Sequence, residues 1–172
     1  MLPDLSSFYP ITQAHISAFH HDGHVCLPGV CSPDEVAAYR EVIVRTAMAA
    51  FAPQKPLGAR DTYGKAFLQT LNLRYQDEGV KKFVLARRFG QIVADLTGVN
   101  AVRIYHEQAL FKEPGGGITP WHQDQYYWPL DTDLAVGMWM PLGDGQKQAS
   151  LLRFAGGRLT DRLAAMPKIT MD

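Results

Sequence analysis

A histidine and an aspartate two residues apart are the best candidates for chemistry in this sequence. His122 and Asp124 lie in ITPWHQDQYYW, residues 118–128. In a strand, residues i and i+2 point to the same face with Cα atoms about 6.5 Å apart, so the imidazole and the carboxylate could converge on one ion. They would supply two of the three ligands of the facial triad that holds non-haem Fe(II). A hydrogen-bonded pair on a sheet gives the same letters, so the surrounding sequence has to decide.

The order of the predicted elements places this pair in the second half of an α+β domain. Three helices are predicted, over residues 11–23, 32–51 and 79–98. Four short strands follow, over residues 100–114, 120–128, 134–142 and 148–157. The change from helical periodicity to two-residue alternation after Gly98 predicts a β-sandwich or barrel core with helices before it.

Local signals define the ends and the inward faces of the helices. Thr12 and Ser32 are the predicted N-caps, Pro33 takes a first helical position, and Gly23 and Gly98 are the predicted stops. The two longer helices each have one apolar stripe, formed by Val36, Tyr39, Ile43, Ala47 and Ala50 in the first and by Phe83, Phe89, Ile92, Val93 and Leu96 in the second. These stripes are predicted to face the core.

The strand predicted over residues 100–114 has one face of mixed polarity. That face carries Ile104, His106, Gln108, Leu110 and Lys112. Glutamine and lysine among apolar neighbours indicate the lining of a cavity, although a sheet edge would give the same pattern. Residues 113–119, EPGGGIT, are predicted to be a flexible turn into the next strand, and residues 52–64 are a predicted loop rich in proline and glycine.

Composition excludes several classes of protein. The chain has 172 residues, of which 47% are hydrophobic and 20% charged, the profile of one globular domain. Lys and Arg number 17, as do Asp and Glu, so no net charge favours nucleic acid or a membrane surface. The N-terminal segment lacks the pattern of a secretion signal. Cys26 and Cys31 are interpreted as small core residues rather than a redox or metal pair, which predicts a reducing, cytoplasmic setting.

A longer block around the pair resembles a known family. RIYHEQALFKEPGGGITPWHQDQYYWPLDTD (residues 103–133), followed by MWMPL, is similar to the phytanoyl-CoA dioxygenase-like branch of the Fe(II)/2-oxoglutarate oxygenases. The resemblance begins upstream in DGHVCLPGVCSPDEV and spans roughly residues 15 to 157. It implies a double-stranded β-helix, or jelly-roll, core with flanking N-terminal helices in one domain over residues 1–172. The helical part would cover about residues 11–98 and the jelly-roll strands about 99–172.

The resemblance also implies a chemistry and roles for individual residues. His122 and Asp124 would bind Fe(II), with 2-oxoglutarate as co-substrate and molecular oxygen as oxidant. A carboxylate at Asp124 favours hydroxylation of a small metabolite over halogenation, because halogenating relatives have a small residue there. Gln108 and Lys112 are candidates for contacts to the oxoglutarate carboxylates, and Trp128 for a wall of the pocket. For Trp128 and for Tyr126, which would share a strand face with Asp124, core packing is an equal alternative, and for Lys112 a solvated strand end is the alternative.

The sequence departs from the family pattern after the pair. The family has a second histidine late in the jelly roll and then an arginine for oxoglutarate, whereas all six histidines here lie at or before His122. Either residues 149–157 match the strand before that histidine, or residues 153–162 match the ligand segment, with Arg153 in the place of the histidine. The chain is therefore part of a longer oxygenase, a relative that binds a ligand without catalysis, or a two-ligand metal site. A cupin that uses a metal other than iron is a further alternative. The prime substrate and oligomeric state are left open.

Overall fold

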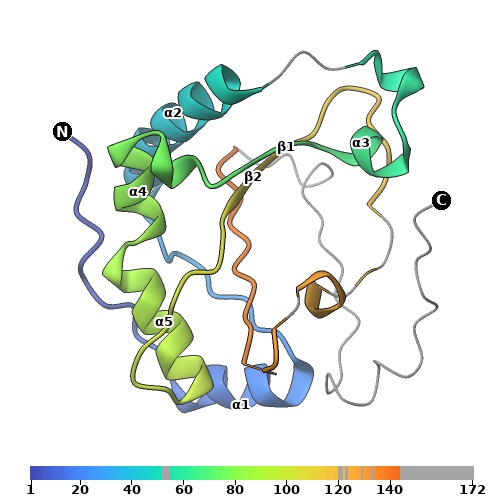
Figure 1. Ribbon diagram of the computed structural model, residues 1–172. Helices are drawn as coiled ribbons and strands as arrows, with labels where there is room; N and C mark the ends of the chain where they lie inside the picture. The colour runs from blue at the N-terminus through green and yellow to red at the C-terminus, as the bar shows by residue number, and fades with distance from the viewer. Residues whose placement is uncertain (52–54, 120–121, 123, 129, 133, 144–172) are drawn as a thin grey trace.

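The computed structural model describes residues 1–51, 55–119, 122, 124–128, 130–132 and 134–143. Its elements, in chain order, are α1 (Gln13–Asp22), α2 (Pro33–Ala50), η1 (Leu57–Ala59), α3 (Thr62–Ala66), β1 (Leu68–Leu71), η2 (Leu73–Tyr75), α4 (Glu78–Val84), α5 (Arg87–Thr97), β2 (Gln108–Phe111) and η3 (Asp124–Tyr127). Helices α2, α4 and α5 are grouped on one side of the molecule, and β1 and β2 cross its centre (Figure 1). The described part is therefore predominantly helical.

The first two helices begin and end at the predicted residues. The Thr12 hydroxyl accepts a hydrogen bond from the His15 amide, and Gly23 ends α1 in a left-handed conformation with φ +75°. Ser32 accepts from the Glu35 amide, while the Glu35 carboxylate accepts from the Ser32 amide, which forms a capping box at the start of α2. Both predictions are confirmed. Such helix ends can be predicted from sequence because side-chain caps and left-handed glycines are local signals.

The helix predicted over residues 79–98 is two helices. It breaks between α4 and α5 at Ala86, whose ψ of 133° is extended. On an uninterrupted helix, residues six apart point about 120° away from each other. The break instead brings the rings of Phe83 and Phe89 to a centroid distance of 5.1 Å, and both are buried. Burial of both rings accounts for the interruption, and Gly98 ends α5 as predicted.

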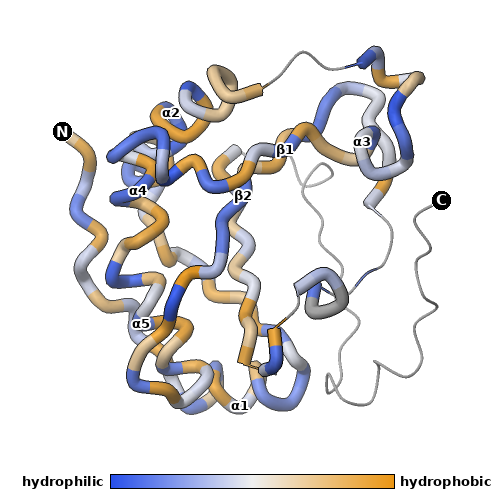
Figure 2. The backbone as a smooth tube through the Cα atoms, viewed as in Figure 1, coloured by the Kyte–Doolittle hydropathy of each residue, from blue (hydrophilic) through white to orange (hydrophobic). Residues whose placement is uncertain are grey.

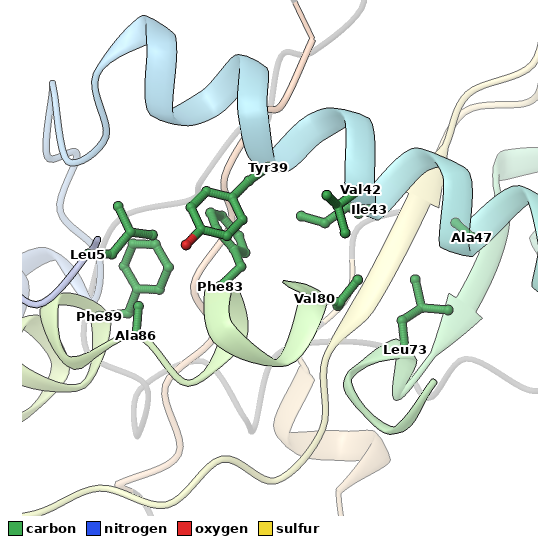
Figure 3. Close-up of a cluster of buried hydrophobic side chains, with 10 residues drawn as sticks. All are labelled: Leu5, Tyr39, Val42, Ile43, Ala47, Leu73, Val80, Phe83, Ala86 and Phe89. Carbon is green, nitrogen blue, oxygen red and sulfur yellow. The ribbon is translucent and has the colours of Figure 1, made fainter. Parts of the chain in front are cut away.

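The core lies between α2 and the α4–α5 pair (Figure 3). Its buried members are Leu5, Tyr39, Val42, Ile43, Ala47, Leu73, Val80, Phe83, Ala86 and Phe89. The predicted stripe of α2 is confirmed, since Tyr39, Ile43 and Ala47 are buried. Hydrophobic and hydrophilic residues alternate along α2, α4 and α5, as expected for helices with one face on a core (Figure 2).

A two-stranded antiparallel sheet borders this core. β1 pairs with β2 so that Leu68 lies opposite Phe111 and Leu71 opposite Gln108. Ala109 and Phe111 pack against the core, and the Phe111 ring meets Phe51 of the α2 C-cap edge to face. Because side chains alternate along a strand, Gln108 belongs to the face of β2 that points away from the helices.

The strand predictions are only partly correct. Of residues 100–114, Gln108–Phe111 alone form a strand, and the described residues of 134–142 form none. The segment predicted as a strand over residues 120–128 contains the 3-10 helix η3, so the strand that would have aligned Tyr126 with Asp124 is absent. The predictions for residues 148–157 and 153–162 lie outside the described residues. A short strand is stable only with a partner, which single-sequence alternation does not reveal.

Two further sequence interpretations can be compared with the structure. Cys31 packs against the core as expected, but Cys26 is exposed, so the core interpretation of Cys26 is wrong. Both thiols are free. Within the described residues, no helix is both long and apolar enough to cross a lipid bilayer.

Candidate metal centre

His122 and Asp124 are close together although no strand holds them. The His122 Nε2 atom lies 3.3 Å from Asp124 Oδ1. Two ligands about 2.1 Å from a metal ion and at right angles to each other are about 3.0 Å apart, so this separation fits neighbouring positions on one ion. The side chains remain 38% and 66% exposed, which leaves the pair accessible to an ion and to further ligands.

The pair offers two candidate ligands, which is fewer than a facial triad contains. In the part of the chain that the structure describes, no cluster of three or more His, Cys, Asp or Glu side chains could hold a metal ion. A facial triad needs one more protein ligand beside the pair. The described residues thus fit two of the three protein positions of an Fe(II) site.

A glycine from the segment 134–142 closes one side of Asp124. A Cβ atom added to Gly137 would lie 3.3 Å from Asp124 Oδ2, which is tighter than most real contacts of this kind. The backbone of this segment therefore passes close to the carboxylate. The sequence reasoning missed Gly137, although a glycine inside an otherwise apolar strand pattern is a known signal of close approach.

Trp128 joins the pair's segment to the residues before β2. Its ring centroid lies 4.2 Å from that of His106 and 5.6 Å from that of Tyr105. His106 Nδ1 is buried and makes no hydrogen bond within the described residues, where the ring contacts Tyr105 and Trp128. Trp128 is partly buried, which is compatible with either a pocket wall or core packing.

The two candidate oxoglutarate contacts have different surroundings. Gln108 is exposed at the start of β2, on the face away from the helices. The Lys112 ammonium is already in contact: it donates to the carbonyl oxygen of Ala66 at 2.8 Å and to that of Gly117, and it lies 4.3 Å above the Phe67 ring. Gln108 has the freer side chain of the two.

A buried ion pair fixes the start of β2 from the opposite face. Arg74 in η2 pairs with Glu107, and the Arg74 amide also donates to Glu107 Oε1 at 2.9 Å. Burial lowers the pKa of Arg74, but the hydrogen bonds to Tyr75 and Glu107 outweigh burial and raise that pKa above its usual value. The sequence gives no sign of this pair, because its partners lie 33 residues apart.

Comparison with known proteins identifies the family of this chain. The family model for phytanoyl-CoA dioxygenase (PhyH) matches residues 19–157. The chain belongs to the phytanoyl-CoA dioxygenase (PhyH) family. The PhyH match covers α2, both strands of the sheet and the His122–Asp124 pair. No curated protein and no solved structure matches the chain.

PhyH membership makes oxygenase chemistry the general expectation for this chain. It also associates the chain with a cupin or jelly-roll fold. The described residues show two paired strands and several helices, and they do not by themselves show such a core. His122 and Asp124 fall inside the matched region, and so do Gln108, Lys112 and Trp128.

Proposed function

We propose that this protein is an Fe(II)- and 2-oxoglutarate-dependent dioxygenase that oxidises a small metabolite with molecular oxygen. The observation that carries the proposal is the 3.3 Å approach of His122 Nε2 to Asp124 Oδ1 inside the region matched by the PhyH family. When bound, Fe(II) and 2-oxoglutarate supply the oxidising chemistry, in which oxoglutarate loses CO₂ and becomes succinate.

In this proposal the protein's own residues bind the metal, orient the co-substrate and shield it from water. His122 Nε2 and an Asp124 carboxylate oxygen are the two metal ligands. The Gln108 amide, on the open face of β2, donates a hydrogen bond to an oxoglutarate carboxylate. Trp128, packed on His106, forms an apolar wall that keeps water from the bound co-substrate. A zero net charge favours an uncharged or zwitterionic metabolite over a large anion.

The proposed architecture is a single domain over residues 1–172 with the family's jelly-roll core. The helices cover one face of the β1–β2 sheet, and Gln108 lies on the other. A jelly-roll core of this kind requires one face of the sheet to be available to the site. We also propose a cytoplasmic location, on the composition of the chain and its two free cysteines.

Ligand binding without turnover is the second candidate function. It is favoured by one sequence fact: no histidine follows His122 in the 172 residues. An iron ion held by one imidazole and one carboxylate keeps more positions filled with water than a triad does. We therefore expect the 172-residue chain alone to convert oxoglutarate slowly or not at all.

Succinate release separates the two functions. The chain is incubated with Fe(II), ascorbate and 2-oxoglutarate in air, with and without free imidazole, which can occupy a vacant ligand position. A dioxygenase gives weak succinate release that rises with imidazole and is lost in His122→Ala. The control is His21→Ala, which removes an exposed histidine that already has a carboxylate neighbour, Asp22. Equal succinate release from the unaltered chain and from His122→Ala contradicts the proposal. No succinate release from the unaltered chain, even with imidazole, favours binding without turnover.

A further inference from the structure

The segment that carries the His122–Asp124 pair is attached at both ends to residues that flank β2. At the N-terminal end of this segment, the glycine-rich turn after β2 packs against α3. The Gly117 amide donates to the Lys65 carbonyl at 2.7 Å. The Lys112 ammonium bridges the same two parts, because it donates to Ala66 O at 2.8 Å and to Gly117 O.

The glycines of this turn allow a close approach to α3. A Cβ atom at Gly116 would lie 3.0 Å from the Glu113 carbonyl oxygen and 3.1 Å from that of Lys65. Gly115 has a φ of +75°, a conformation that side chains rarely adopt. The sequence predicts a flexible turn here, and the structure shows why glycine is needed: the turn is packed backbone to backbone against α3.

An ion pair reinforces this first attachment. The Arg60 guanidinium pairs with the Glu113 carboxylate through both terminal nitrogens. It also donates to the carbonyl oxygens of Lys55 at 2.7 Å and Gly64 at 3.3 Å. Arg60 thereby ties the residues before α3, α3 itself and the turn into one unit.

The second attachment is aromatic. Trp128, at the far end of the segment, packs on His106 and Tyr105, which precede β2. Residues on the two sides of one short strand thus hold the two ends of the segment, and the His122–Asp124 pair lies between them. β2 is itself fixed by its pairing with β1 and by the Arg74–Glu107 ion pair.

We propose that Lys112 and His106 are positioning residues that set the place of His122 and Asp124 from the two ends of β2. Lys112 acts through the Gly117 carbonyl, and His106 acts through Trp128. This inference rests on the proposed function only for its metal readout. It assigns Lys112 a role within the protein rather than a contact to oxoglutarate, and it assigns His106 a packing role rather than a place among the metal ligands.

The test compares four variants with one matched control. Lys112→Met removes the ammonium and keeps the alkyl chain, and Lys112→Arg restores a donor. His106→Ala removes the ring, and His106→Phe keeps a ring but no nitrogen. The control Gly58→Ala lies in η1, where an added Cβ meets nothing within 4 Å. The first readout, taken without metal, is the amide NMR shift of His122 and Asp124. The second is the Mn(II) dissociation constant.

Lys112→Met and His106→Ala are expected to shift both amides and to weaken Mn(II) binding about tenfold, as for residues that orient metal ligands. Lys112→Arg, His106→Phe and Gly58→Ala are expected to resemble the unaltered protein. Unchanged amide shifts in Lys112→Met and His106→Ala would overturn the proposal, as would shifted amides with unchanged Mn(II) affinity. Loss of binding in His106→Phe would overturn it by making His106 a ligand. If the unaltered protein binds no Mn(II), the proposed function fails, and the amide shifts still decide this inference.

Discussion

Replacing Arg88 by methionine is expected to destabilise the helical layer behind the sheet. The Arg88 guanidinium donates to both carboxylate oxygens of Glu35, at 2.9 and 3.0 Å. It also donates to the carbonyl oxygens of Ser7 at 3.1 Å and Val30 at 2.8 Å, and to the Ser7 hydroxyl at 2.6 Å. One side chain therefore joins the N-terminal segment, the loop before α2, and α2 itself to α5.

The magnitude follows from burial. The Arg88 and Glu35 side chains are 9% and 17% exposed, so the pair is largely withdrawn from water. Removing one partner of a buried ion pair costs about 3–5 kcal/mol. Glu35 keeps its hydrogen bond from the Ser32 amide at 2.8 Å. The lower end, about 3 kcal/mol, is therefore expected, which lowers the melting temperature by roughly 6–12 °C in a domain of this size.

Urea unfolding and thermal melting measure this loss against a matched ion pair. Arg45 lies 3.4 Å from Asp77 and is 62% exposed, so Arg45→Met is expected to change the free energy of unfolding by less than about 1 kcal/mol. If Arg88→Met also lost less than about 1 kcal/mol, the reasoning from burial would be refuted.

Two further predictions concern pH and the candidate site. The hydrogen bonds from Arg88 hold the pKa of Glu35 below its usual value of 4.5. A lowered carboxylate pKa stabilises the folded state at pH values above that usual value, and this contribution is lost as pH falls through the folded pKa. Stability should therefore fall less steeply with acid in Glu35→Gln than in the unaltered protein. Gly137→Ala should weaken Mn(II) binding severalfold by displacing Asp124, whereas Gly143→Ala, with open space around it, should not; equal affinities would contradict the close approach at residue 137.

The features predicted correctly from the sequence are those set by local signals. Thr12 and Ser32 cap their helices, and Gly98 ends α5, because the signals lie within one helical turn of the residues that they affect. His122 and Asp124 lie close together as predicted, although the strand from which this proximity was predicted is absent. The expectation that this pair binds a metal came from the resemblance to the family.

The features that were missed depend on partners far away in the chain. β1 has no clear alternation, and it is a strand because it pairs with β2 about 40 residues later. The break at Ala86 follows from burial of Phe83 and Phe89 in a core that the helical period alone does not describe. The contacts of Lys112 with Ala66 could not be read from a strand pattern either, because the alternation gives only a face.

Mn(II) binding followed by electron paramagnetic resonance tests the metal centre most directly, with Mn(II) as an oxygen-stable substitute for Fe(II). The structure offers a demanding control in His21 and Asp22, whose ring nitrogen and carboxylate are 2.7 Å apart at the exposed end of α1. We expect one Mn(II) ion per chain, lost in His122→Ala and in Asp124→Ala and retained in His21→Ala. Undiminished binding in His122→Ala would contradict the proposed metal centre, because the metal would then lie elsewhere and His122 and Asp124 would be a structural pair.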